Sequence, residues 1–120
     1  MRPHRRRGPL QHVLVAGSFD ELPVIEAVLL LLPKTAYGQV LVETPEHLEL
    51  PVLELPPRMT VVRLARRQDD EPGSVVATAV HAWLEEWTPG EPDPARTVTA
   101  WVGGVACDPF HFAGATIRSL

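Results

Sequence analysis

The sequence contains a single cysteine, Cys107, so no disulfide can form within the chain. It shows no signal peptide, and its longest apolar run, residues 27–32, is far shorter than the roughly 20 residues that span a bilayer. Together these absences predict a protein of the reducing cytoplasm that makes no contact with a membrane.

An excess of positive charge is also lacking. The formal net charge is −4, which argues against nucleic acid as a partner, because phosphates attract basic surfaces. Residues 1–11 are an exception: they are rich in arginine and lack periodicity, which predicts a flexible basic arm. Residues 12–120 are long enough for one domain with one core.

The motifs of metal-dependent and nucleophilic catalysis are absent. The histidines show no metal-ligand spacing, so we predict neither a metal site nor a catalytic residue. Cys107 and His111 are four residues apart, but no third ligand or orienting acid stands at a recognisable spacing, which favours a buried, inert cysteine. The glycine fingerprint of dinucleotide-binding folds, G-x-G-x-x-G, is missing as well.

The chain does contain a strand, a glycine turn and a helix in direct succession. Residues 12–16 are mostly apolar and predict a buried strand, which Gly17 ends. Asp20 is the expected N-cap of a helix over residues 21–32. This helix is apolar around nearly its full circumference. One sheet cannot cover such a surface, so we expect a homo-oligomer that pairs through residues 21–32.

The same patterns predict further strands and helices along the chain. They are strands over residues 38–43, 60–65 and 97–102, a helix over 75–87 with Ser74 as its N-cap, and a last helix over 109–118. Residues 44–58 form a proline-broken connection in which residues 51–55 fit a short edge segment. Strands separated by crossovers predict a mostly parallel sheet in a doubly wound α/β fold.

Four segments carry a family resemblance: HVLVAGSFDELPVIEAVLLLLP, GQVLVETPE, TVVRLARR and TVTAWVGG. They resemble the C-terminal, nucleotide-binding domain of the siderophore-interacting proteins, which are flavin-dependent ferric-siderophore reductases. The resemblance covers residues 12–120. It implies the fold of a ferredoxin-reductase C-terminal domain, a three-layer Rossmann-like α/β arrangement with strand order 3-2-1-4.

The resemblance also implies a function. In the family, this domain brings NAD(P)H to a flavin held by an N-terminal β-barrel and helps to form a basic cleft for the siderophore. The barrel and its flavin-binding motif are absent from this sequence. We therefore expect that the chain binds no flavin by itself, is not a complete reductase, and serves a flavin-binding protein in trans.

The sequence departs from the family pattern in three places. After the first strand the family usually reads AG-D-E-T, whereas this chain reads AGSFD at residues 16–20. After the fourth strand the family usually has Trp-x-x-Gly-Glu, and residues 101–104 are not followed by the glutamate. The closing strand of the family, which follows its last helix, is expected to be missing.

The candidate nucleotide-binding residues follow the first, second and fourth predicted strands. Phosphates are expected at the turn before the first helix and beside a glycine pair, at Gly17, Ser18, Asp20, Gly103 and Gly104. A plain capped turn at the first position and a simple tight turn at the second are the alternatives.

Two other candidate sites lie at predicted strand ends. Glu43 suits a contact with ribose hydroxyls, which would favour NAD over NADP; the alternative is a solvent-facing carboxylate. Arg63, Arg66 and Arg67 suit a phosphate or an anionic chelate, unless they pair with the nearby acids at residues 69–71.

Two functions remain open at this point. The first is a stand-alone domain that binds NAD(P)H and supports ferric-siderophore reduction in trans. The second is a non-catalytic, dimerising or protein-interaction module that kept the fold and lost the nucleotide site. Both require that Gly17, Glu43, the arginines and Gly103 lie along one edge of the sheet, because parallel strands end on the same side.

Overall fold

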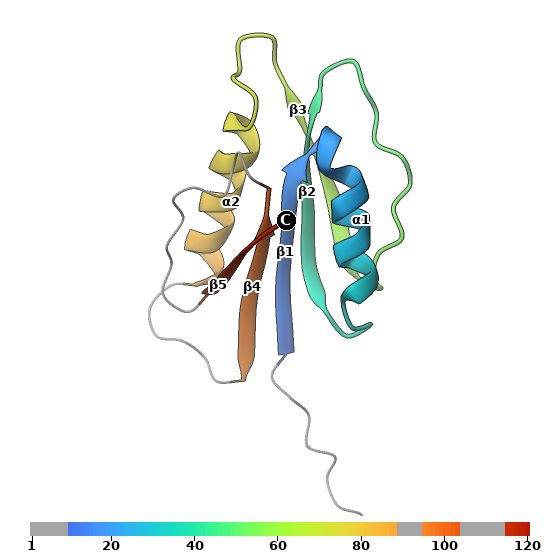
Figure 1. Ribbon diagram of the computed structural model, residues 1–120. Helices are drawn as coiled ribbons and strands as arrows, with labels where there is room; N and C mark the ends of the chain where they lie inside the picture. Colours follow the sequence, from blue (N-terminus) through green and yellow to red (C-terminus); the bar gives the residue numbers. More distant parts are fainter. Residues whose placement is uncertain (1–9, 89–94, 104–114) are drawn as a thin grey trace, which may run out of the picture.

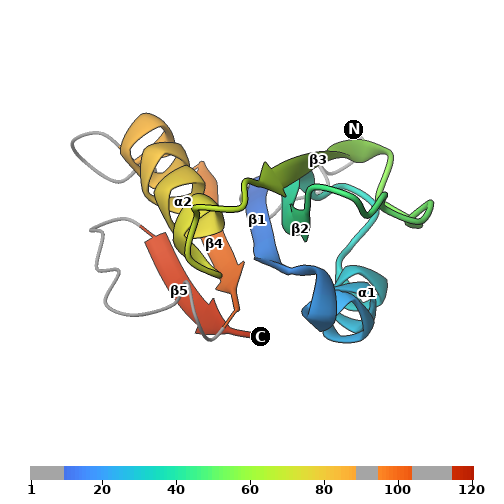
Figure 2. The ribbon, with the colours of Figure 1, turned by 90° about the horizontal axis from the view of Figure 1, so that it is seen from above.

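The computed structural model describes residues 10–88, 95–103 and 115–120. It is a parallel five-stranded sheet with a helix on each face (Figures 1 and 2). The elements in chain order are β1 (Leu10–Ser18), a 3-10 turn (Phe19–Glu21), α1 (Leu22–Leu31), β2 (Tyr37–Pro45), β3 (Arg58–Arg66), α2 (Ser74–Trp87), β4 (Arg96–Val102) and β5 (Ala115–Ser119).

The strand order is β3-β2-β1-β4-β5, and every neighbouring pair is parallel. The predicted α/β class, the parallel sheet and the order 3-2-1-4 are therefore confirmed, with one strand added beyond β4. β2 and β3 extend the sheet on one side of β1, and β4 and β5 then extend it on the other side. The order thus reverses between β1 and β4, and it is beside such a reversal that open α/β sheets form a crevice for ligands.

The face covered by α1 holds the first of two apolar clusters. Ile25 and Leu29 of α1 are buried against Val13 and Val15 of β1. The proline-rich segment between β2 and β3 extends this layer, since Leu53 is buried in the same cluster although residues 46–57 form neither helix nor strand. A short edge strand at residues 51–55 was therefore a wrong prediction.

The opposite face is covered by α2. Val80 and Leu84 of this helix are fully buried against Leu14 of β1 and Ala100 of β4. Successive residues of β1 thus contribute to opposite clusters, as expected for a strand buried on both faces. Within the described residues no helix is long and apolar enough to cross a membrane.

Gly38 allows β1 and β2 to approach each other. Its φ is +142°, and a β-carbon at this position would lie 1.9 Å from the backbone oxygen of Val13, its partner in the sheet. Only glycine fits such a backbone conformation and such a contact.

The two ends of the chain differ from the prediction. Leu10 and Gln11 begin β1 instead of belonging to an N-terminal arm, and residues 1–9 lie outside the described residues. Residues 115–118 belong to β5 and not to a helix over 109–118, whose residues 109–114 also lie outside the described residues. The expectation that the closing strand is missing was therefore wrong, because β5 pairs with β4 in parallel.

Both predicted N-caps are corrected by the structure. Asp20 lies within the 3-10 turn that precedes α1, and the capping contact there is made by Glu21, whose carboxylate accepts a hydrogen bond from the Ser18 amide at 3.0 Å. Ser74 is the first residue of α2 and its hydroxyl donates to the backbone oxygen of Glu71; the N-cap is Gly73, with φ of +90°. The carboxylate that accepts hydrogen bonds at the start of α2 belongs to a distant strand, as described below.

Candidate nucleotide-binding edge

The carboxyl ends of the strands bring the predicted site residues to one edge of the sheet. Ser18, at the end of β1, pairs in register with Glu43 on β2. On one side, Pro45 pairs with Arg66 at the end of β3; on the other, Ala16 pairs with Val102, which directly precedes Gly103. The arrangement that both functional hypotheses require is therefore present.

β1 and β4 meet at this edge beside two buried glycines, Gly17 and Gly103. The Gly103 amide donates to the backbone oxygen of Ala16 at 2.8 Å, so the two chains are tied together there. A β-carbon on Gly17 would lie 3.0 Å from Glu21 Oε1, and one on Gly103 would lie only 2.1 Å from the same atom. The Glu21 carboxylate thus occupies the space that two glycines leave open.

Glu43 is buried and points to the start of α2. Its side chain has no exposed surface, and its two oxygens accept from the amides of Gly73 at 2.7 Å and Val76 at 3.0 Å. Arg66 lies 3.3 Å from the same carboxylate. The alternative of a solvent-facing carboxylate was wrong. The carboxylate neutralises the positive end of the α2 dipole, which is where a bound anion would otherwise be favoured.

The three arginines have separate environments. Arg63 binds the connection that follows β2, because its guanidinium donates to the backbone oxygens of Leu48 at 2.6 and 2.9 Å and of Glu46 at 2.9 Å. Arg66 is paired with Glu43, whereas the pairing predicted for it was with residues 69–71. These two guanidinium groups are engaged within the protein.

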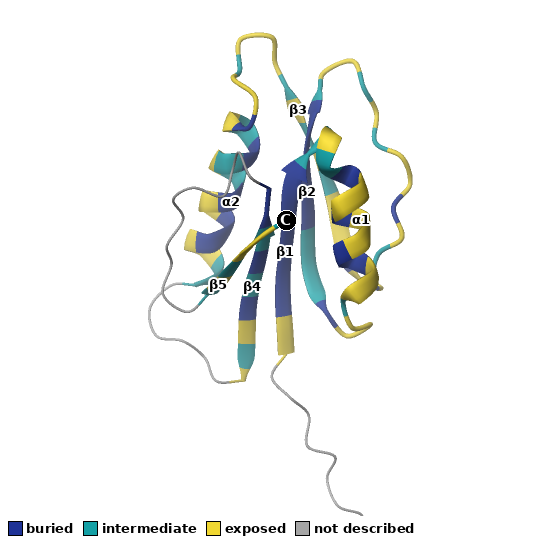
Figure 3. Cartoon of the chain, viewed as in Figure 1, coloured by how far each residue is buried: buried dark blue, intermediate teal, exposed yellow. Residues whose placement is uncertain are grey.

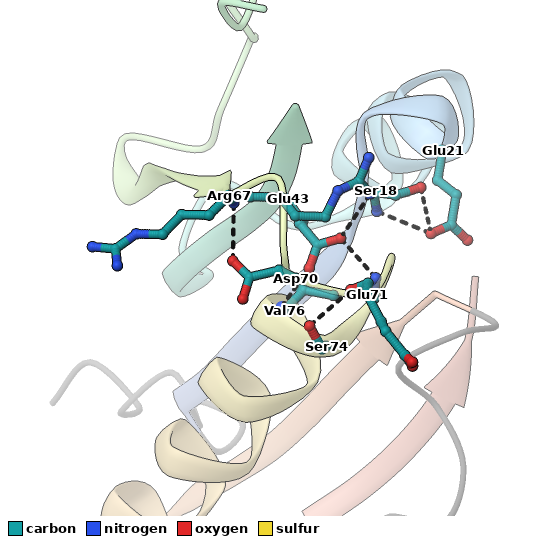
Figure 4. Close-up of polar contacts among 10 residues, drawn as sticks. Ser18, Glu21, Glu43, Arg67, Asp70, Glu71, Ser74 and Val76 are labelled. Carbon is teal, nitrogen blue, oxygen red and sulfur yellow. Dashed lines mark hydrogen bonds and ion pairs between the residues drawn. The ribbon is translucent and has the colours of Figure 1, made fainter. Parts of the chain in front are cut away.

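Arg67 is exposed, and only its backbone amide contacts Asp70, at 2.9 Å. In Figure 4 its side chain extends away from the Glu43 cluster. With Arg66 it lines an open pocket of about 670 Å³ beyond β2 and β3, together with Pro45, Glu46, His47, Gln68, Asp70 and Pro72. Of the three predicted arginines, Arg67 is the one whose position best fits an incoming anion.

Comparison with known proteins identifies the family of this chain. A model of the siderophore-interacting protein family matches residues 10–108, which is most of the chain. The chain belongs to the siderophore-interacting protein family. A search of curated proteins gave no match.

Two solved structures have the same fold as this family member. A siderophore utilization protein from T. fusca aligns with a TM-score of 0.57 at 19% identity, over 96% of this chain and 46% of that one. The siderophore-interacting protein SipS from Aeromonas hydrophila aligns with a TM-score of 0.53 at 18% identity, over 82% and 39% of the two chains. The present chain therefore spans less than half the length of either structure.

The capping role of Glu21 is the feature of the site in this family member that the sequence analysis missed. The signal was present, because Ser18 and Glu21 form the S-x-x-E pattern of a capping box. The pattern was overlooked because Asp20 looked like the better cap. Gly104, Cys107 and His111 lie outside the described residues, within which no group of three potential metal ligands occurs.

A second buried polar group lies at the opposite edge of the sheet. His12 is 3% exposed; its ring stacks on Tyr37 at 4.4 Å and contacts Trp83 and Trp87. Burial, and then the positive charge of Arg96, lower the pKa of His12 from 6.5 to about 4. This histidine is a neutral core residue at pH 7, at the amino end of β1 and at the opposite edge from the predicted site residues.

Proposed function

We propose that the chain is the nicotinamide-nucleotide domain of a ferric-siderophore reductase system. It binds NAD(P)H at the carboxyl ends of β1 and β4 and presents the hydride to a flavin held by a separate domain or protein. The chain itself carries out no iron chemistry and provides no group that reacts. Its task is to hold and orient the dinucleotide.

The observation that carries this proposal is the pair of glycines at the reversal of strand order. Gly17 and Gly103 stand at the carboxyl ends of β1 and β4 without side chains of their own, next to the amino end of the 3-10 turn and α1. Phosphate oxygens suit such a place, because the backbone can be approached closely and the helix dipole is positive there. Membership of the family supports the same ligand.

The predicted preference for NAD over NADP required an exposed carboxylate at the end of β2. Glu43 is instead buried against α2. We therefore propose NAD(P)H without preference. Arg67 and the neighbouring open pocket suit a negatively charged group, either of the nucleotide or of an anionic ferric chelate.

The proposal predicts nucleotide binding that depends on Gly103. Titration of the chain with NADH and NADPH by calorimetry should give a saturable signal at millimolar nucleotide or below. Gly103→Ala should raise the dissociation constant at least about tenfold, because its β-carbon, which would lie 2.1 Å from Glu21 Oε1, forces that carboxylate to move and takes up the space beside Gly17. The substitution is compatible with the backbone, since Gly103 is not among the described glycines with positive φ.

A matched control keeps this test specific. Val52→Ala changes a fully exposed residue of the connection between β2 and β3 and should leave nucleotide affinity unchanged. If the wild-type chain, shown to be folded by circular dichroism, gives no signal with either nucleotide at several millimolar, the proposed function is wrong.

A second candidate function is a protein-interaction module that pairs through α1. Leu30 and Leu31 are 76% and 81% exposed, and the outer face of α1 stands clear of the sheet (Figure 3). Leu30 also lines an open pocket with Leu55 and Pro56 of the neighbouring connection. Adjacent exposed leucines beside such a pocket are more typical of an interface than scattered surface residues are.

This candidate predicts a dimer that charge on α1 disrupts. Light scattering should give twice the chain mass at high protein concentration, and the double substitution Leu30→Glu with Leu31→Glu should return the mass of one chain. Glu86→Ala, on the exposed side of α2, is the control. A wild-type chain that is monomeric at millimolar concentration would exclude pairing through this surface.

A further inference from the structure

The carboxyl end of α1 and the end of the connection between β2 and β3 form the two walls of an open groove. Its volume is about 440 Å³, and it is lined by apolar side chains of both segments, among them Leu29 and Leu32 on one wall and Leu55 and Pro56 on the other. Leu31, which stands between two lining residues, is 81% exposed. The surface therefore presents an exposed leucine beside an apolar hollow, and both lose free energy by facing water.

The groove also carries one charge of each sign. Lys34 belongs to the wall formed by α1 and the residues that follow it, and Glu54 belongs to the opposite wall. Both side chains are exposed, and neither takes part in an ion pair within the described part of the chain. A partner that neutralises both charges must present an acid opposite Lys34 and a base opposite Glu54.

A second copy of this chain presents such a surface. In a pair related by a two-fold axis, each contact between two different residues is made twice with the roles exchanged. Leu31 of one protomer then enters the groove of its partner, and the partner's Leu31 enters the first groove. Lys34 of each protomer faces Glu54 of the other. The groove and its charges are thus self-complementary, as an interface between identical chains has to be.

We propose that two copies of the chain pair about a two-fold axis through this groove. Leu31 provides the apolar contact, and the oppositely charged Lys34 and Glu54 fix how the two copies are oriented. The proposal rests on the second candidate function and deepens it, because it names the partner, the hollow that receives it and the charges that select it.

The groove lies at the opposite end of the sheet from the candidate nucleotide-binding edge. Only residues 32–36 separate α1 from Tyr37, the first residue of β2, which pairs with His12 near the amino end of β1 (Figure 1). Arg58 directly follows the groove residue Pro57, begins β3 and pairs with Tyr37. A dimer formed through the groove therefore does not involve the carboxyl ends of the strands, so pairing is compatible with nucleotide binding in both copies.

Charge reversal at the two positions tests this arrangement. Lys34→Glu and Glu54→Lys each place like charges opposite one another twice in a homodimer, so each should raise the dissociation constant of the dimer at least about tenfold. The double variant Lys34→Glu with Glu54→Lys restores opposite charges and should dimerise within about threefold of the wild type. Light scattering over a dilution series measures these constants.

A mixture of the two single variants gives a sharper result. The heterodimer of Lys34→Glu with Glu54→Lys contains two attractive charge pairs, whereas each homodimer contains two repulsive ones. With one variant isotope-labelled, native mass spectrometry of the mixture should show mainly the heterodimer. Arg67→Glu and Glu86→Lys are the matched controls, because they reverse exposed charges after β3 and on α2. Their mixture should give the statistical distribution of pairs.

The outcomes separate this inference from the candidate function on which it rests. If the wild type dimerises and neither charge reversal weakens it, or if the mixture of the two variants is statistical, the groove charges do not direct the pairing and the inference is overturned, while pairing through α1 stands. A wild type that stays monomeric at millimolar concentration overturns both. Weakened single variants together with a restored double variant establish the two-fold contact.

Discussion

Replacing Glu43 with alanine is expected to lower the free energy of unfolding by about 3 kcal/mol or more. The substitution removes the acceptor for the amides of Gly73 and Val76 and leaves both donors buried without it. It also leaves Arg66 without its partner. A charged acceptor contributes more than a neutral one, and a buried donor left unsatisfied is a further loss. The amino end of α2 should therefore unfold first.

Urea denaturation of matched variants separates the two roles of Glu43. Glu43→Gln keeps one acceptor oxygen but turns a donor toward a backbone amide, so its effect should be about 2 kcal/mol. Arg66→Met removes the ion pair but leaves the hydrogen bonds from the Gly73 and Val76 amides to Glu43, so it should lower the free energy of unfolding by about 1 kcal/mol or less. Glu46→Ala, at an exposed acid just beyond β2, should change the stability by less than about 0.5 kcal/mol.

The ranking of these variants is the informative result. If Arg66→Met destabilises the chain as much as Glu43→Ala, the ion pair and not the helix cap is the main contribution of Glu43. Hydrogen exchange gives a second readout, since the Gly73 and Val76 amides should lose protection in Glu43→Ala and keep it in Arg66→Met.

The alternation of apolar strands with turn residues was sufficient to predict most of the fold. β1 to β4, α1 and α2 were expected within a few residues of where they lie, because each is a contiguous apolar or periodic run between glycine, proline or charged segments. β5 was missed because Asp108 and Pro109 resemble a helix start, whereas residues 115–119 acquire their strand conformation from pairing with β4. Pairing with a distant strand leaves little trace in a short local sequence.

The site was predictable in its position but not in its contacts. Parallel strands place Gly17, Glu43 and Gly103 on one edge whatever their side chains do, so the edge followed from the element order. The direction of the Glu43 carboxylate did not, because its partners Gly73 and Val76 are about 30 residues away and belong to another element. Contacts between backbone amides and a distant carboxylate have no sequence motif.

The stability of the chain should fall steeply between pH 7 and pH 4 because of His12. The pKa of His12 is about 4 in the folded chain against 6.5 for an unperturbed histidine, so the unfolded state binds a proton that the folded state does not. The stabilisation is complete above pH 6.5 and is lost as the pH falls toward 4. From the two pKa values, about 2 kcal/mol is lost by pH 5 and about 3 kcal/mol by pH 4.

His12→Phe isolates this contribution, because phenylalanine keeps an aromatic ring against Tyr37, Trp83 and Trp87 but does not titrate. It also removes the His12 Nδ1 atom, which has no hydrogen-bond partner within the described residues. Urea denaturation at pH 7 and pH 5 should therefore show about 2 kcal/mol less pH dependence in His12→Phe than in the wild type.

The exposed residue His47 provides the control: His47→Gln should keep the wild-type dependence. Equal slopes for the wild type and His12→Phe would mean that the carboxylates, and not the buried histidine, govern acid unfolding. A flatter slope in His12→Phe alone would establish that the aromatic cluster at the amino ends of β1 and β2 excludes a proton at physiological pH.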